Sequence, residues 1–157
     1  MNMPKKLLFV CLGNICRSPA AENIMNLLIE QEGLSDRYIC DSAGTGGWHV
    51  GALPDHRMRS AAQARGMNFV GSARQFRAID LQEFDLILAM DKDNYRNILA
   101  LDPQRKFADK VKMMCDYCET STDKEIPDPY YGSGDGFNYV IDLLFETCGG
   151  LLKALKA

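Results

Sequence analysis

The residues in this sequence that could do chemistry are concentrated in the segment 11–18, which reads Cys-Leu-Gly-Asn-Ile-Cys-Arg-Ser. It directly follows the apolar run 7–10 and leads into a helix-compatible stretch that opens with Pro19. Gly13 and Asn14 tolerate positive φ, so the backbone is expected to curl until successive N–H groups point at one centre and bind an oxyanion. The unpaired N–H groups and dipole of the following helix would add positive potential there. The segment therefore predicts a phosphate-binding loop with a cysteine inside it.

Three side chains in this segment have the properties that phosphoryl transfer needs. Cys11 would lie in the field of the loop and the helix, which favours its thiolate, the nucleophilic form of cysteine. Arg17 has a planar fork that can hold two phosphoryl oxygens while negative charge develops on them. Ser18 can donate a hydroxyl hydrogen bond to the sulfur. Singly, these residues also fit a buried cysteine and a surface arginine, but their combination in one short loop argues against that simpler interpretation.

Two motifs near opposite ends of the chain resemble one known family. The stretch 10–21 resembles the phosphate loop of the low-molecular-weight protein tyrosine phosphatases, and the segment 128–132, Asp-Pro-Tyr-Tyr-Gly, resembles their acid loop. The similarity includes residues 41–45, 73–75 and 85–91 and extends over nearly the whole chain. It implies a hydrolase without metal or cofactor that acts on phosphotyrosine in proteins or peptides and on small aryl phosphates. The expected intermediate is a phosphocysteine, and the expected product is inorganic phosphate.

A second chemical group, a proton donor, is expected on the acid loop. An alkoxide or phenoxide leaves phosphorus more easily when an acid protonates the leaving oxygen. Asp128 lies between Pro127 and Pro129, which restrict the backbone and would hold its carboxyl group at a fixed angle. By itself an Asp-Pro pair more often marks a turn or a helix cap. The resemblance assigns Asp128 as the acid that protonates the leaving group and then activates water.

The resemblance also implies which residues bind the substrate. In the loop these are Leu12, Gly13, Asn14, Ile15, Cys16 and Ser18, and at the mouth of the pocket they are Trp48, Tyr130 and Tyr131. Aromatic walls would suit an aryl phosphate. The alternative is that these aromatic side chains only pack their loops onto the body of the protein.

Further residues are expected to support the loop rather than to react. By resemblance, Asn14 holds the loop in its strained shape, and Ser42 and Asp91 are orienting groups near it. Several relatives carry a histidine just before the Ala-Arg-Gln segment that braces the loop from behind. Gly71 and Ser72 stand there in this chain, which leaves that bracing interaction open.

The chain has six cysteines, which in an exported protein would suggest three disulfides. Lys5-Lys6 and the apolar residues after them imitate a signal peptide, but the apolar run is short and stops at Gly13-Asn14. Reduced thiols in the cytoplasm are therefore expected. The position of Cys16 within the loop would let it capture a sulfenic acid at Cys11 as a reversible disulfide, and relatives use such a pair.

Cys115 and Cys118 form a Cys-x-x-Cys pair, which raises the possibility of zinc or thioredoxin-like chemistry. There is no second such pair, and His49 and His56 lie far upstream without the spacing of metal ligands, so no metal site is expected. Cys40 and Cys148 are predicted to be core residues.

Length and composition favour one globular domain over residues 1–157, since 46% of the 157 residues are hydrophobic and 25% are charged. The net charge of −3 and the scattered basic residues argue against a nucleic-acid partner.

No apolar stretch reaches the roughly 20 residues that span a bilayer, so no membrane partner is expected. No Gly-Lys-Ser/Thr follows Gly13, so a Walker-type nucleotide site is not expected. A monomer is predicted.

Strand-like and helix-like segments alternate along the chain. Predicted strands cover 6–10, 38–43, 85–90 and 110–114, and predicted helices cover 19–32, 54–65, 92–101 and 137–156. The last helix is expected to be disturbed at Gly149-Gly150. The alternation predicts an α/β domain with a four-stranded parallel sheet and helices on both faces. The phosphate-binding loop, after the first strand, would then lie where such folds bind ligands.

Three other functions share features of this sequence with the phosphatase. Thioredoxin-coupled arsenate reductases have a similar loop and relay cysteines upstream of the Asp-Pro loop, and Cys115 and Cys118 also precede Asp128 here. In those reductases, however, the relay cysteines are more widely spaced and the Tyr130-Tyr131 pair is absent. Protein arginine phosphatases typically have threonine where this chain has Ile15, and the branched apolar side chain suits a phenyl ring better. A phosphotyrosine-binding pseudoenzyme would lack the nucleophile or the acid, whereas Cys11 and Asp128 are both present.

Overall fold

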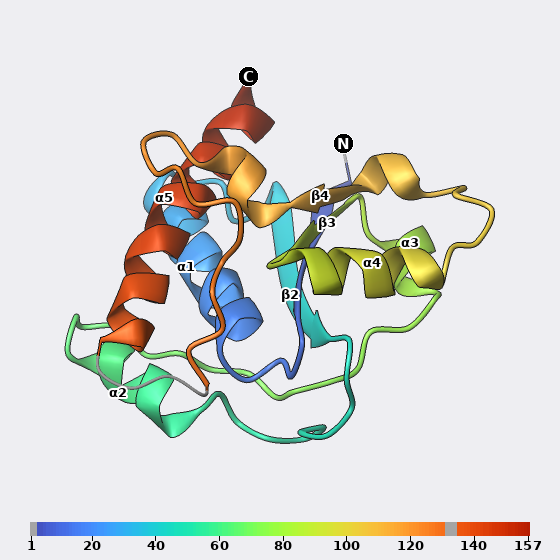
Figure 1. Ribbon diagram of the computed structural model, residues 1–157. Helices are drawn as coiled ribbons and strands as arrows, with labels where there is room; N and C mark the ends of the chain where they lie inside the picture. Colours follow the sequence, from blue (N-terminus) through green and yellow to red (C-terminus); the bar gives the residue numbers. More distant parts are fainter. Residues whose placement is uncertain (1–2, 131–134) are drawn as a thin grey trace.

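The core of the fold is a parallel β-sheet. Within residues 3–130 and 135–157, which this computed structural model describes, four strands form it in the order β2-β1-β3-β4. The strands are β1 (Lys5–Cys11), β2 (Tyr38–Gly44), β3 (Leu86–Ala89) and β4 (Val111–Met113). Every neighbouring pair is parallel, so the carboxyl ends of the strands lie at one edge of the sheet (Figure 1). The predicted sheet is confirmed.

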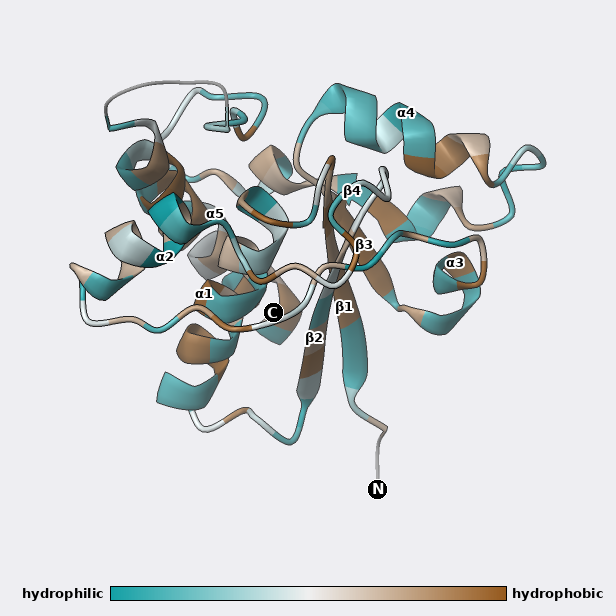
Figure 2. Ribbon diagram, turned by 90° about the horizontal axis from the view of Figure 1, so that it is seen from below, coloured by the Kyte–Doolittle hydropathy of each residue, from teal (hydrophilic) through white to brown (hydrophobic). Residues whose placement is uncertain are grey.

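Helices cover both faces of this sheet. They are α1 (Arg17–Gln31), α2 (His56–Gln63), α3 (Asp80–Glu83), α4 (Lys92–Ala100) and α5 (Gly136–Lys156), with the 3-10 helices η1 (Ala108–Lys110) and η2 (Met114–Tyr117). Figure 2, seen from below, shows α1, α2 and α5 on one side of the strands and α3 and α4 on the other. The predicted α/β class with two helical layers is therefore confirmed.

The residues of β1 explain why both faces are covered. Leu7 and Phe9 are fully buried in the core shared with α1 and α5, while Leu8 and Val10 are fully buried in the core shared with α3 and α4. Successive side chains of a strand point to opposite faces, so a continuous apolar run is stable only between two helical layers. β1 therefore stays in the middle of the sheet and carries its loop to the edge.

The predicted elements differ from the structure by one or two residues at several ends, the 3-10 helices η1 and η2 were not predicted, and two further differences have a clear physical reason. A short helix, α3, was not predicted, because a single turn of four residues carries too little periodicity. The expected disturbance of the last helix is wrong, since α5 runs unbroken through Gly149-Gly150. A side chain at Gly150 would place its Cβ 2.1 Å from the carbonyl oxygen of Tyr117 in η2. The glycine thus permits close packing between two elements rather than ending the helix.

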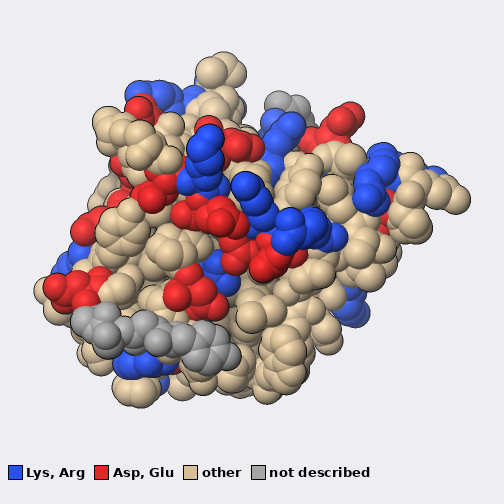
Figure 3. Space-filling model, in the orientation of Figure 1, with Lys and Arg blue, Asp and Glu red and all other residues tan. Residues whose placement is uncertain are grey.

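Charged side chains of both signs are mixed over the face drawn in Figure 3. Exposed ion pairs such as Lys153–Glu119 at 2.9 Å link neighbouring elements. Within the described residues, no helix combines the length and apolar character that crossing a membrane requires.

Candidate active site

The loop between β1 and α1 has the curled backbone that its sequence predicts. Asn14 has φ of +57°, in the left-handed region that asparagine tolerates better than most residues. Gly13, which also tolerates positive φ, does not adopt it, so Asn14 alone in this loop has a left-handed backbone. Gly13 instead allows a close neighbour, because a Cβ there would lie 3.1 Å from Cδ2 of His49.

The carbonyl groups of the loop turn away from its centre. Those of Cys11 and Leu12 each accept a backbone hydrogen bond of 2.9 Å from the segment 45–46 that follows β2. Within the described residues, the N–H groups of Gly13 and Ile15 donate no hydrogen bond. Helix α1 begins directly after the loop without a side-chain cap, so its first N–H groups are also available. The loop can therefore surround an oxyanion with donors.

The sulfur of Cys11 is buried and held by polar partners. It lies 3.0 Å from Oγ of Ser18 and accepts a hydrogen bond of 3.3 Å from the N–H of Asn14. Cys11 is only 2% exposed. These contacts fix the position of the sulfur within the loop.

Arg17 is a buried cation at the same place. It is 2% exposed, and its Nη1 donates to Oδ2 of Asp91 at 2.6 Å and to the carbonyl of Ile126 at 3.0 Å. Its Nη2 lies 3.4 Å from Oδ2 of Asp128. Burial alone would lower the pKa of Arg17, but the charge of Cys11, the hydrogen bond to Asp91 and the charge of Asp128 raise it above its ordinary value. The guanidinium is therefore a fixed positive charge.

The predicted acid reaches the loop from the other end of the chain. Figure 1 shows the segment 118–130 running from η2 to the edge of the sheet where the loop lies. There Oδ1 of Asp128 accepts the N–H of Tyr130 at 3.0 Å, while Oδ2 faces Arg17. The carboxyl group remains 30% exposed, so it is open to the pocket and to water.

One hollow of about 280 Å³ brings these groups together. It is lined by Cys11, Leu12, Gly13, Ile15, Cys16, Arg17, Trp48, His49, Asp128 and Tyr130. Trp48 stands at its mouth with 73% of its surface exposed. Tyr131 lies outside the described residues.

Two residues near the mouth were not predicted to belong to the site. The ring of His49 lies 6.0 Å from that of Tyr130 at an angle of 52°. The guanidinium of Arg57 lies 5.1 Å from the centre of the Tyr130 ring, a cation–π contact. The only sequence feature that marked His49 was its place beside Trp48, and no local pattern marked Arg57.

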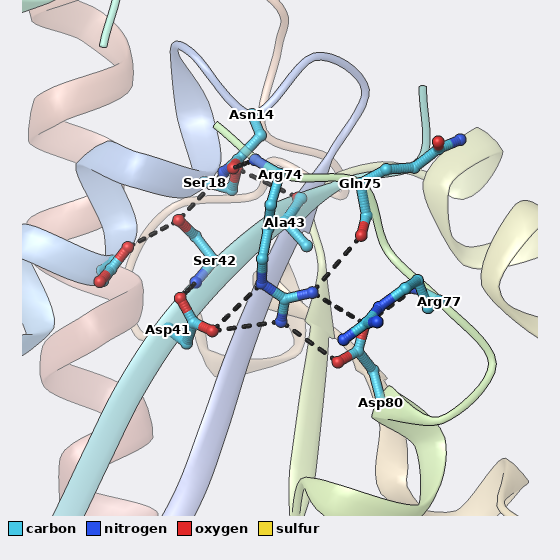
Figure 4. Close-up of polar contacts among 10 residues, drawn as sticks. Asn14, Ser18, Asp41, Ser42, Ala43, Arg74, Gln75, Arg77 and Asp80 are labelled. Atoms are coloured by element: carbon cyan, nitrogen blue, oxygen red, sulfur yellow. Dashed lines mark hydrogen bonds and ion pairs between the residues drawn. The ribbon is translucent and has the colours of Figure 1, made fainter. Parts of the chain in front are cut away.

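Behind the loop, Asn14 is the centre of a hydrogen-bond network (Figure 4). Its Nδ2 donates to Ser18 at 2.8 Å and to Ser42 at 3.0 Å, and its Oδ1 accepts the N–H of Arg74 at 2.9 Å. Ser42 in turn donates to Oε1 of Glu22 at 2.6 Å. The loop is thus braced by Glu22, through Ser42, and by the backbone of Arg74.

Ion pairs connect the hydrogen-bond network around Asn14 to the rest of the fold. The side chain of Arg74 binds Asp41 at 3.1 Å and Asp80 at 3.0 Å, which anchors the backbone that contacts Asn14. Burial and, secondarily, the charge of Asp41 raise the pKa of Glu22 to about 7, against the opposing effects of Ser42 and Arg74. Sequence analysis missed Glu22 because nothing in α1 marks it as inward-facing.

Cys40, Cys115, Cys118 and Cys148 do not belong to the loop or line its hollow. Burial is the main cause of the raised pKa of both Cys115 and Cys118, on and next to η2, and neither lines the hollow around Cys11. No group of three or more metal-ligating side chains occurs among the described residues. Cys148 is fully buried as predicted, whereas Cys40 is only partly buried on β2.

A cysteine and an arginine in an anion-binding loop, with a carboxyl group across the pocket, define a site for cysteine-based phosphoryl transfer. The sequence profile described as "Low molecular weight phosphotyrosine protein phosphatase" matches residues 6–157. A Synechocystis sp. protein that carries a provisional name in this family is 62% identical over 150 residues, 96% of each chain. The chain belongs to the low molecular weight phosphotyrosine protein phosphatase family.

Solved structures agree with that assignment. A protein tyrosine phosphatase from Entamoeba histolytica, crystallised with Hepes in its active site, has a TM-score of 0.93 and 46% identity over 97% of each chain. A Drosophila arginine phosphatase has a TM-score of 0.89 and 33% identity, also over 97% of each chain. Together with the family, these similarities make this chain a cysteine-based protein-tyrosine phosphatase.

Proposed function

We propose that Cys11 is the nucleophile and Asp128 the general acid of the phosphatase reaction. The Cys11 thiolate attacks phosphorus and forms the S–P bond while the tyrosine oxygen leaves with the proton of Asp128. The Asp128 carboxylate then takes a proton from water, which attacks phosphorus and releases inorganic phosphate and the Cys11 thiolate. The observation that carries this proposal is that both residues, 117 positions apart in sequence, line the same hollow.

Arg17 and the loop N–H groups would hold the three equatorial phosphoryl oxygens. The contact between Arg17 and Asp128 is long, at 3.4 Å, so an arriving phosphoryl group can replace the carboxylate as the partner of Nη2. The shorter contact of Nη1 with Asp91 would persist and keep the guanidinium in place. Asp128 would then be released to face the leaving oxygen.

The walls of the hollow support phosphotyrosine as the substrate. Ile15 is apolar, and Trp48 and Tyr130 provide aromatic surface for a phenyl ring. We include small aryl phosphates as further substrates. The similarity to an arginine phosphatase makes phosphoarginine the second candidate, and the apolar Ile15 favours the aryl group over a guanidinium.

We propose that residues 1–157 form a single domain that acts as a monomer in the cytoplasm. Its substrates would be phosphotyrosine-containing proteins. It would need no metal or cofactor and would bind neither nucleic acid nor a membrane. All six cysteines are free thiols, as a reducing compartment would keep them. Leu12, Gly13, Asn14, Cys16 and Ser18 would contribute through the loop, and Ser42 and Asp91 through its support.

Hydrolysis of para-nitrophenyl phosphate and of a phosphotyrosine peptide, in EDTA with reductant, tests the proposal. A phosphoarginine peptide is assayed beside them, and Cys11→Ser is the control. We expect release from both tyrosine-type substrates that disappears in the variant, and a trapped phosphoenzyme in rapid quench. Faster release of phosphate from the phosphoarginine peptide than from the phosphotyrosine peptide would contradict the proposed substrate. Phosphatase activity that survives in Cys11→Ser would contradict the proposed mechanism.

A further inference from the structure

A second hollow adjoins the catalytic one on the far side of Trp48. Its volume is about 400 Å³, and Leu12 and Trp48 belong to the walls of both hollows. The remaining wall comes from the segments 45–46 and 75–76, from Asn97 of α4 and from Leu101 just beyond it. We call this hollow the Trp48 groove. A polypeptide that leaves the catalytic hollow can therefore enter the groove directly over Trp48.

The walls of the Trp48 groove are held in place. The indole packs on Gly46 so closely that a Cβ there would lie 2.0 Å from Cζ3 of Trp48. The Nε2 of Gln75 donates to the carbonyl of Thr45 at 3.2 Å, which joins the two segments of the wall. The groove is thus formed before any substrate arrives, which lowers the entropic cost of binding.

The chemistry of the Trp48 groove differs from that of the catalytic hollow. The described residues that line it include no Asp, Glu, Lys, Arg or His, whereas Arg17, His49 and Asp128 line the hollow around Cys11. Phe76 and Leu101 add apolar surface, and Gln75 and Asn97 add amide groups. A charged side chain placed here would lose part of its hydration without gaining an oppositely charged partner. An amide side chain can exchange hydrogen bonds with Gln75 and Asn97, and an apolar side chain has no hydrogen bonds to lose.

We propose that the Trp48 groove binds an uncharged side chain of the substrate polypeptide that lies within a few residues of the phosphotyrosine. This inference rests on the proposed function, because it requires the phosphotyrosine to occupy the catalytic hollow. One residue of extended chain spans about 3.5 Å, so a neighbour one to three positions away can reach across the indole. Leu101, Asn97 and Gln75 are then specificity-determining residues, and they take no part in the chemical step.

Peptides test this assignment. Each position within three residues of the phosphotyrosine is occupied in turn by Leu, Gln, Asp or Lys, and kcat/KM is measured beside that for para-nitrophenyl phosphate. We expect one position at which kcat/KM for the peptides with Leu or Gln exceeds kcat/KM for those with Asp or Lys by about tenfold. One buried side chain contributes an effect of this size. Equal rates for all peptides at every position would overturn the proposal.

A charge placed in the groove separates a binding role from a structural one. Leu101 is 45% exposed and follows the end of α4, where a lysine is compatible with the helix dipole. In Leu101→Lys the peptide with Asp at the sensitive position should become the best substrate, while para-nitrophenyl phosphate is hydrolysed as before. The matched control is Val70→Lys, a 59% exposed residue that lines neither hollow.

The possible failures are distinguishable. If wild-type protein does not hydrolyse para-nitrophenyl phosphate, the proposed function fails. If it does, and Leu101→Lys leaves the peptide preference unchanged or shifts it no more than Val70→Lys does, the groove assignment alone is wrong.

Discussion

Nη1 of Arg17 lies 2.6 Å from Oδ2 of Asp91, so the cation of the phosphate loop is held by a carboxylate from the carboxyl end of β3. The other oxygen of Asp91 accepts the N–H of Asn94 at 2.8 Å and caps α4. Asp91 thus caps α4 with one carboxylate oxygen and orients the guanidinium of Arg17 with the other. The arrangement leaves Nη2 to face Asp128 and the pocket.

Replacement of this carboxylate should reduce catalysis more than stability. Asp91→Asn keeps an oxygen for the helix cap but removes the charge that orients Arg17. We expect kcat/KM for para-nitrophenyl phosphate to fall about tenfold, because the guanidinium no longer has one fixed position. The matched control is Asp93→Asn on the same helix, whose side chain is 76% exposed and, among the described residues, forms an ion pair with Arg96 alone. Equal loss in both variants would show that the Arg17 contact is not responsible.

The acid role assigned to Asp128 predicts a dependence on the leaving group. In Asp128→Ala the departing oxygen receives no proton, so hydrolysis of phenyl phosphate should fall by about a hundredfold or more. Para-nitrophenolate leaves without protonation far more readily, so its release should be much less affected. A plot of log kcat/KM against the pKa of the leaving phenol measures this and should become steeper in the variant, because kcat/KM reports the step in which the phenol leaves and not the hydrolysis of the phosphocysteine, which Asp128 also assists. An unchanged slope would contradict the assignment.

The loop that we propose as catalytic could be located from sequence because its candidate reactive groups lie in one continuous segment. Residues 11–18 follow an apolar strand and precede a helix, and each residue type has a recognisable role. Asp128 was predicted from its prolines and from the resemblance. Glu22 and Arg74 were not, because their function depends on how α1 packs on β2 and on where the backbone before α3 passes Asn14. Such contacts leave no local pattern.

The pKa of Glu22, raised to about 7 mainly by burial, predicts how stability changes with pH. An unfolded glutamate ionises near 4.5, so between about pH 4.5 and pH 7 the folded protein binds a proton that the unfolded chain has released. The free energy of unfolding should therefore fall as pH rises through this window. Below it both states are protonated, and above it both are ionised.

Glu22→Gln removes this dependence. Relative to wild type, the variant should be similar at pH 4.5 and more stable at pH 8 by up to about 3 kcal/mol, because one pKa unit corresponds to about 1.4 kcal/mol. Urea unfolding at pH 4.5, 6 and 8 measures the difference. Glu30→Gln, an exposed position on the same helix, is the control and should follow the wild-type profile. A Glu22→Gln profile parallel to wild type would contradict the prediction.

Cys16 is expected to protect Cys11 from irreversible oxidation. Burial, the charge of Asp55 and the charge of Cys11 raise the pKa of Cys16, so it stays a thiol beside the nucleophile. Peroxide would convert the Cys11 thiolate to a sulfenic acid, and Cys16 sulfur would displace water from it to form a disulfide. Peroxide-treated wild type should regain activity with a dithiol reductant, while Cys16→Ser should not. Equal recovery in both would contradict this role.

Gly149 and Gly150 form a matched pair for testing why α5 continues through both. Gly150 is buried, and a Cβ there would lie 2.1 Å from the carbonyl oxygen of Tyr117, whereas a Cβ at Gly149 has nothing within 4 Å. Since helix interiors favour alanine over glycine by about 1 kcal/mol, Gly149→Ala should stabilise the protein by up to that amount. Gly150→Ala should instead destabilise it by about 2 kcal/mol, because α5 and η2 must move apart. Thermal unfolding of both variants measures the difference. Two equal shifts would mean that the contact with η2 does not constrain the helix.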